Sequence, residues 1–292
     1  MVLAIQIILI ALVAYFAAIF IKDIIAHKDN LGSGNWAVAF VIGFITDALD
    51  TLGIGSFAPT TLLLDATKQL ENDRQLPGTL NVAHSIPVIV EALLFLTVVE
   101  VQPVTLFSLV IAAAVGSLLG SKIIAKMPER KIQFIMGIAL IVTAVLMGMK
   151  QVGWLDMLGT DNTATGLTGI KLIIGIVGNA VFGALMTAGV GLYAPCMAMV
   201  YMLGVSPIVA MPIMMTSCAA LMPVASREFI KTGNYARKVS LGITLGGVIG
   251  VVLAVNFVKG LDMNILTWVI IAVVIYTGIN MLLKSKKAPS AA

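Results

Sequence analysis

Leu52-Gly-Ile-Gly-Ser-Phe-Ala-Pro59 recurs 136 residues later as Ala188-Gly-Val-Gly-Leu-Tyr-Ala-Pro195, and both copies lie within strongly apolar sequence. Glycine permits unusual backbone dihedrals, whereas proline lacks an N–H and cannot continue a helical hydrogen-bond ladder. Each copy therefore predicts a break in a helix. At membrane depth such a break is tolerated only where it is buried in protein or lines a cavity. A pair of breaks in corresponding positions points to the binding site of a transporter.

The composition indicates a polytopic helical membrane protein. Of 292 residues, 60% are hydrophobic and 11% are charged, and the mean hydropathy is +1.06, whereas soluble domains carry roughly 25% charged residues. The net charge is +4, but the basic residues are spread over short loops, which argues against nucleic-acid binding. Cys196 and Cys218 lie in apolar stretches without the spacing of a disulfide framework or a metal site, so we interpret them as buried packing residues.

Apolar runs of about 18 residues or more predict the membrane spans. These runs lie near 2–21, 80–99, 104–125, 132–149, 207–225, 239–258 and 265–283. The first run has no basic residue before Lys22, which favours a retained helix over a cleaved signal peptide. The two stretches that carry the breaks, about 36–66 and 170–205, are expected to form helix–break–helix hairpins that return to the side from which they enter.

The basic residues predict the orientation. In this topology all lysines and arginines except Lys150, Lys171 and Lys259 fall on one face, and the positive-inside rule places that face in the cytoplasm. We therefore expect a multi-pass protein of the cytoplasmic membrane with its N-terminus outside and its C-terminus in the cytoplasm. The lipid bilayer is its expected partner, and formation of a homo-oligomer is left open.

The two hairpins enter from opposite faces, and three spans follow each of them. The predicted fold is all-α, with an N-terminal helix and loop (1–30) followed by two inverted repeats (31–150 and 151–292) in one integral membrane domain. Further matches between the halves support the duplication. At an offset of 134 they are Gly116 with Gly250, Thr143 with Thr277, Met147 with Met281, and Lys150 with Lys284.

Four stretches of the chain resemble the TauE/SafE family of membrane transporters, the sulfite exporters. They are Asp50-Thr-Leu-Gly-Ile-Gly-Ser-Phe-Ala-Pro59, Leu76-Pro-Gly-Thr-Leu-Asn-Val82, Gly189-Val-Gly-Leu-Tyr-Ala-Pro-Cys196 and Pro212-Ile-Met-Met-Thr-Ser-Cys218. The resemblance implies a permease for a small, often sulfur-containing anion such as sulfite or an organosulfonate. No nucleotide-binding loop and no nucleophile or metalloprotease motif is present, so we expect a secondary transporter without enzyme activity or cofactor.

The predicted binding site lies between the two breaks. A broken helix exposes a new N-terminus with unpaired N–H groups and a positive dipole end, and two such ends can hold an anion without a buried lysine or arginine. The expected contributors are Gly53, Gly55, Ser56, Phe57, Pro59 and Thr60 in the first half and Gly189, Gly191, Tyr193 and Pro195 in the second. The alternative is that the breaks serve only close helix packing.

Acidic residues accompany the first break but not the second. Asp47 and Asp50 share one helical face, whereas the equivalent residues are Gly183 and Met186. Buried carboxyl groups in a membrane are costly and indicate function. Both are therefore proton-coupling candidates, with capping of the break as the alternative for Asp50.

Polar residues on the next predicted span extend this group. Asn81, His84 and Glu91 share a face. We predict Asn81 and His84 as substrate contacts and Glu91 as a further proton-coupling candidate, with plain packing as the alternative for His84. Thr216 and Ser217 occupy the related position in the second half and are expected to line the site.

Three other functions stay open. Methionines crowd the segment from Met186 to Met222 near both cysteines, and such soft ligands suit a soft-metal transporter, although flexible packing also explains them. The acidic residues suit a cation carrier. A non-transporting membrane scaffold is the third alternative, and it predicts no cavity at the breaks.

Overall fold

The computed structural model describes residues 2–51, 54–95, 101–158, 161–257 and 263–286. These residues form helices and connecting loops, with one isolated bridge between Ala164 and Val205. The helices are α1 (Val2–Ala26), α2 (Trp36–Thr51), α3 (Phe57–Ala66), η1 (Asp73–Gln75), α4 (Leu76–Phe95), α5 (Pro103–Ile124), α6 (Glu129–Gln151), α7 (Trp154–Met157), α8 (Gly169–Met186), α9 (Tyr193–Met202), α10 (Pro207–Thr232), α11 (Arg237–Phe257) and α12 (Met263–Lys286). The all-α class is confirmed, and each predicted span overlaps one of these helices.

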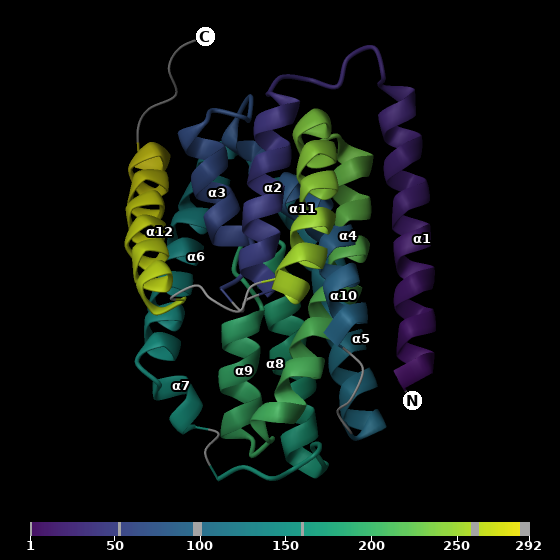
Figure 1. Cartoon of the computed structure of the whole chain (residues 1–292), viewed down its shortest axis with the longest axis vertical. Helices are drawn as coiled ribbons and strands as arrows, with labels where there is room; N and C mark the ends of the chain where they lie inside the picture. Colours follow the sequence, from purple (N-terminus) through teal and green to yellow (C-terminus); the bar gives the residue numbers. More distant parts are fainter. Residues whose placement is uncertain (1, 52–53, 96–100, 159–160, 258–262, 287–292) are drawn as a thin grey trace.

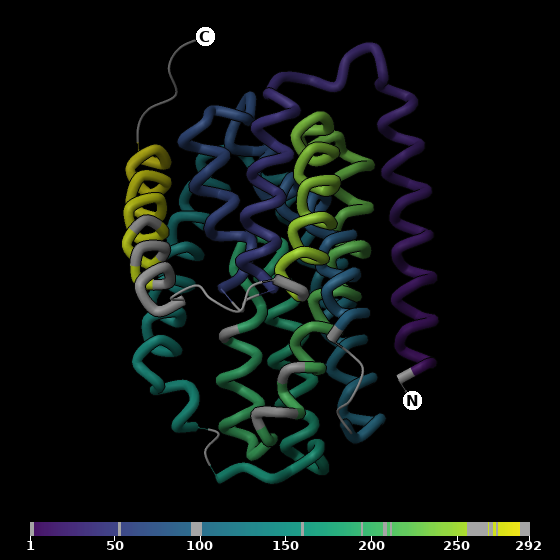
Figure 2. Tube along the Cα trace, viewed as in Figure 1, coloured from purple at the N-terminus to yellow at the C-terminus, as the bar shows by residue number. Residues whose placement is uncertain are grey.

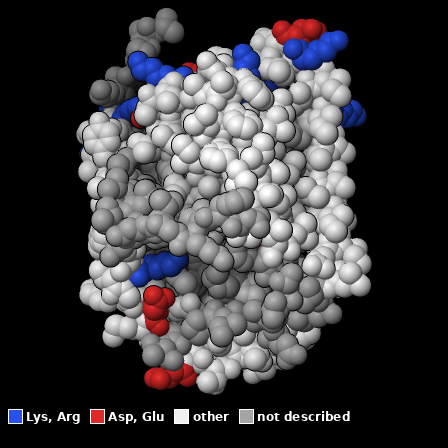
Figure 3. Space-filling view, in the orientation of Figure 1, with Lys and Arg blue, Asp and Glu red and all other residues white. Residues whose placement is uncertain are grey.

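Within the described residues, five helices are long and apolar enough to cross a membrane. They are α1, α5, α6, α8 and α11. In Figure 3 most basic side chains lie at the upper end of the molecule, and one basic group with acidic groups below it lies at the lower left. The described surface between these two ends is uncharged in this view. An uncharged belt of this kind is what a lipid-facing surface requires.

Two short helices begin within the repeated motif. Helix α2 ends at Thr51 and α3 starts at Phe57, while α8 ends at Met186 and α9 starts at Tyr193. Helices α3 and α9 have ten residues each, or about 15 Å at 1.5 Å per residue, which is half of a hydrocarbon core. In Figure 1, α2 and α3 occupy the upper half and α8 and α9 the lower half, so the two breaks meet near mid-height.

Glycines allow two pairs of helices to pack at very short distance. A Cβ atom on Gly250 of α11 would lie 2.2 Å from the carbonyl oxygen of Phe44 in α2, and one on Gly116 of α5 would lie 1.9 Å from that of Ala180 in α8. Only glycine permits such an approach, as is common between membrane helices. Positions 116 and 250, and likewise 44 and 180, match between the two halves of the sequence.

The remaining contacts enclose the two breaks. Helix α6 packs on α12, α4 packs on α10 and α11, and α5 packs on α10. Helix α1 runs along one side of the bundle (Figure 2) and contacts α10 and α4. The short helices that follow the breaks contact the same group, α3 with α4 and α9 with α6 and α10, so the breaks lie inside the bundle.

Candidate functional site

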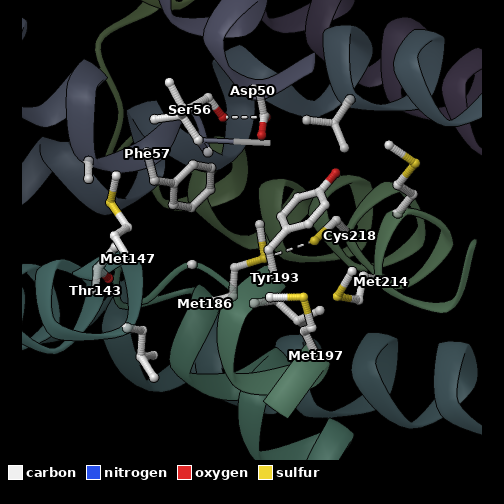
Figure 4. Close-up of a pocket in the computed structure, with 18 of the residues that line it drawn as sticks. Asp50, Ser56, Phe57, Thr143, Met147, Met186, Tyr193, Met197, Met214 and Cys218 are labelled. Carbon is white, nitrogen blue, oxygen red and sulfur yellow. Dashed lines mark hydrogen bonds between the residues drawn. The ribbon is translucent and has the colours of Figure 1, made fainter. Parts of the chain in front are cut away.

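A cavity of about 240 Å³ lies where the two broken hairpins meet. Figure 4 shows Asp50, Ser56 and Phe57 on one side of it and Tyr193 opposite them. Of the predicted site residues that the structure describes, Asp50, Gly55, Ser56, Phe57, Gly189, Gly191 and Tyr193 line this cavity. The scaffold alternative, which requires both breaks to be packed solid, does not fit this opening.

The starts of α3 and α9 both border the cavity. Ser56 and Leu192 immediately precede these helices and line the cavity, and each accepts a backbone hydrogen bond of 3.0 Å from the residue four positions later. The N–H groups of the first turn have no acceptor within the helix. Pro59 and Pro195 occupy the third helical position, where proline leaves no N–H unpaired. The two prolines were predicted as solute contacts, but the described lining of the cavity does not include them.

Glycines in the two breaks have different roles. Gly55 and Gly189 have φ angles of +91° and +98°, in the left-handed region that favours glycine. Gly191 lies outside that region, and a Cβ atom built on it meets nothing within 4 Å. The absence of a side chain at Gly191 therefore leaves space in the cavity. Gly53, also predicted as a contact, lies outside the described residues.

Behind the cavity, three elements bring together Asp47, His84 and Thr60. The Nδ1 atom of His84 lies 2.8 Å from Oδ1 of Asp47, and its Nε2 atom lies 3.0 Å from Oγ1 of Thr60. All three side chains are buried. Neutral His84 can donate from Nδ1 to Asp47 and accept from Thr60, whereas the protonated ring donates to both. The arrangement can thus hold a proton at His84 between two partners.

Asp50 and Glu91 extend this group to the cavity. The hydroxyl of Ser56 donates to Oδ2 of Asp50 at 2.7 Å. The alternative role of Asp50, capping of N–H groups near Gly53, stays a prediction, because Gly53 lies outside the described residues. The hydroxyl of Tyr193 lies 3.4 Å from Oε1 of Glu91. Asp50 interacts electrostatically with Asp47, and Glu91 interacts with both. The three carboxyl groups predicted for proton coupling therefore form one cluster.

Each carboxyl group in this cluster has one oxygen without a hydrogen-bond partner among the described residues. These atoms are Oδ2 of Asp47, Oδ1 of Asp50 and Oε2 of Glu91. Burying an unsatisfied polar atom costs about 1–3 kcal/mol, and more when it is charged. The cluster therefore favours a proton, an ordered water or a cation on these oxygens.

The other predicted polar contacts are not among the described residues that line the cavity. Asn81 donates from Nδ2 to the carbonyl oxygen of Pro77 at 2.9 Å, and Ser217 accepts a 3.0 Å hydrogen bond from Asn179, which joins α8 to α10. Thr216 is buried beside Ser217. Their assignment as solute contacts stays a prediction, because the described lining of this cavity does not include them.

Two sets of lining residues were missed as site residues. The side chains of Met186, Met197, Met214 and Cys218 lie on one side of the cavity (Figure 4), and Met215 also lines it. The second set, Thr143, Met147 and Lys150, lies on one face of α6. Their recurrence at an offset of 134 is a signal in the sequence that could have identified them.

Comparison with known proteins identifies the family. The profile of the Sulfite exporter TauE/SafE family matches residues 2–147, which is half of the 292-residue chain. No curated protein and no solved structure matches the chain. The matched segment runs from α1 into α6 and includes the first broken hairpin, the Asp47–His84 contact and Asp50. The resemblance seen in the sequence is confirmed, and the chain belongs to the Sulfite exporter TauE/SafE family of membrane transporters.

Proposed function

We propose that the chain is a secondary permease that moves a small anion, sulfite or an organosulfonate, across the cytoplasmic membrane. One observation carries this proposal: the starts of α3 and α9 border the same cavity, and that cavity contains the two glycine breaks. Each helix start carries a partial positive charge and N–H groups that face an incoming ligand. The two helix starts together attract a negative group without a fully buried lysine or arginine.

The size and lining of the cavity favour an organic anion. Its 240 Å³ corresponds to about eight water molecules at ~30 Å³ each, which is more than sulfite alone needs. The methionine side chains on one wall are flexible and apolar. An organosulfonate can place its anionic group at the helix starts and its carbon body against this wall.

Protons are the proposed coupling ions. An ionised Asp50 at the wall of the cavity would repel an anion. Protonation of Asp50 removes this repulsion, so entry of the anion favours uptake of a proton. Asp47 and Glu91 interact electrostatically with Asp50, and His84 is hydrogen-bonded to Asp47, so these groups offer further positions for the proton.

Alternating access is the proposed mechanism, with 31–150 and 151–292 as inverted repeats that rock against each other. The contacts of α2 with α11 and of α5 with α8 are equivalent pairs, each joining one half to the other, and this equivalence supports the duplication. The loop charges favour the upper end of Figure 1 as the cytoplasmic face, with the N-terminus outside.

Flux measurements test the proposal. Purified protein in proteoliposomes should take up sulfite or short organosulfonates, and an imposed proton gradient should change the rate. Gly191→Leu, which fills the cavity, should stop uptake while the protein still inserts and unfolds cooperatively. No flux of any of these anions from a folded protein would refute the proposed function.

A soft-metal carrier is the second candidate. The Sγ atom of Cys218 lies 3.9 Å from Sδ of Met186, and further methionines line the same cavity, a ligand set that suits Cu(I) or Ag(I). Silver uptake that Cys218→Ala abolishes, with no response to anions, would favour this function over the first.

A further inference from the structure

One face of α6 borders the cavity at the breaks. Thr143, Met147 and Lys150 all border the cavity. Their spacing of four and three residues places them on one side of the helix. Lys150 is in the last turn of α6, beyond the membrane centre, and interacts electrostatically with Asp156 of α7.

The same three residue types recur on α12, where the threonine and the methionine are buried and the lysine is ion-paired. Thr277 and Met281 are 2% and 1% exposed. The Nζ atom of Lys284 lies 2.5 Å from Oδ1 of Asp65 at the end of α3 and 3.5 Å from Oδ2 of Asp73 in η1. On α12, Thr277 and Met281 are therefore covered, and Lys284 is ion-paired although its side chain is 37% exposed. The matching residues of α6 border the cavity.

Additional contacts hold the α12 end of the molecule together. Gln133 of α6 donates to Oδ2 of Asp73 at 3.0 Å, and the Nε atom of Arg130 donates to the carbonyl oxygen of Ser285 at 3.1 Å. These bonds join α6, η1 and α12 around Lys284. At the other end, Lys150 is the one basic residue among the described residues that line the cavity.

We propose that Lys150 and Lys284 are paired anion-capture residues, one for each mouth of the transport path. In this structure Lys150 serves the mouth on the α7 side. Lys284 is held by Asp65 and Asp73 and contributes to closing the opposite mouth. When the α12 face opens, Lys284 separates from these carboxylates and attracts the anion there. This inference rests on the proposed function, because it assigns the charges that bring the anion to the helix starts.

Sided uptake measurements test the role of Lys150. Membrane vesicles of both orientations are sorted by the accessibility of a C-terminal tag, and uptake of a short organosulfonate is measured from each side. Lys150→Gln should raise KM about fivefold or more from the α7 side, as expected for the loss of a charge near a solvated anion. Lys150→Arg should keep the wild-type KM. Lys171→Gln is the matched control, because it removes a charge from an exposed residue at the start of α8 that is outside the described lining of the cavity.

Lys284→Gln should show the reverse sidedness, raising KM from the α12 side. Added salt weakens the attraction between an exposed lysine and an approaching anion. Salt should therefore raise KM from the α7 side more for the wild type than for Lys150→Gln. An unchanged KM in a folded, transporting Lys150→Gln protein would overturn the inference and leave the proposed function intact. Equal effects of Lys150→Gln and Lys171→Gln would also overturn it. Absence of anion transport in the wild type would instead refute the proposed function and this inference with it.

Discussion

Gly247→Ala is expected to break the contact between Asp47 and His84. A Cβ atom at position 247 would lie 2.1 Å from Oδ2 of Asp47 and 2.8 Å from Cγ of Pro87. To reach an ordinary contact of 3.4 Å, the carboxylate must move by about 1.3 Å. A displacement of this size ends the 2.8 Å hydrogen bond to His84. Overpacking and the loss of a buried hydrogen bond to a charged group together cost about 2–5 kcal/mol of unfolding free energy.

The second half of the chain suggests a rescue. There the positions equivalent to Asp47 and Gly247 are Gly183 and Ala113, and a Cβ atom on Gly183 would lie 2.2 Å from the carbonyl oxygen of Ala113. The double variant Asp47→Gly/Gly247→Ala reproduces this pair. It should recover at least ~1 kcal/mol relative to Gly247→Ala, because the methyl group then occupies the space of the carboxylate.

Gly246→Ala is the matched control. Its Cβ atom would lie 1.9 Å from the carbonyl oxygen of Phe40, so it forces α2 and α11 apart without reaching Asp47. Unfolding in detergent, by heat or denaturant, measures the stability of all variants, and proteoliposome flux is normalised to folded protein. Strict additivity of the Asp47→Gly and Gly247→Ala costs would contradict this reasoning. So would an equal rescue of Gly246→Ala by Asp47→Gly.

Three further variants have defined outcomes. Asp50→Asn should keep the fold, because the amide oxygen still accepts a hydrogen bond. Flux through this variant should no longer respond to a proton gradient. An unaltered response would exclude Asp50 as a proton carrier. Gly191→Ala should change the free energy of unfolding by less than about 0.5 kcal/mol while slowing transport. Gly189 has a φ of +98°, so Gly189→Ala should lower the free energy of unfolding by about 1–3 kcal/mol in the same assay. Burial and the hydrogen bond to Asp23 raise the pKa of Tyr235. The contribution of the Tyr235 hydroxyl to the free energy of unfolding is therefore complete below about pH 10 and is lost as the pH rises further. The unfolding free energies of wild type and Tyr235→Phe should converge at high pH. A difference that stays constant with pH would contradict this.

Local features of the chain were sufficient to predict its helices. The apolar run at 104–125 became α5, Pro103–Ile124, and the run at 132–149 became the central part of α6. The length of an apolar run predicts whether it can cross a bilayer, and glycine and proline predict where a helix breaks. Both signals are contained in short stretches of sequence. For the same reason the membrane class and the transporter family were recognisable from the sequence.

Convergence of the polar groups could not be predicted in this way. Asp47, Thr60 and His84 come from three helices, and whether they meet depends on how each helix is rotated and packed. Lys150 and Lys284 occupy matching positions, yet one borders the cavity and the other is held by Asp65 and Asp73. The matching threonine, methionine and lysine of the two halves do not by themselves distinguish these two environments.

The sequence by itself determined the membrane fold class, the helical segments and the two breaks, because short-range sterics, hydrogen bonding and hydrophobic length decide those features. The tertiary structure alone decided that the breaks share one cavity, that the carboxyl groups cluster behind it, and that one of two equivalent lysines faces it. Those features depend on contacts between segments that are distant in the sequence, from 37 residues for Asp47 and His84 to 102 for Glu91 and Tyr193. No local pattern in a single sequence specifies such contacts.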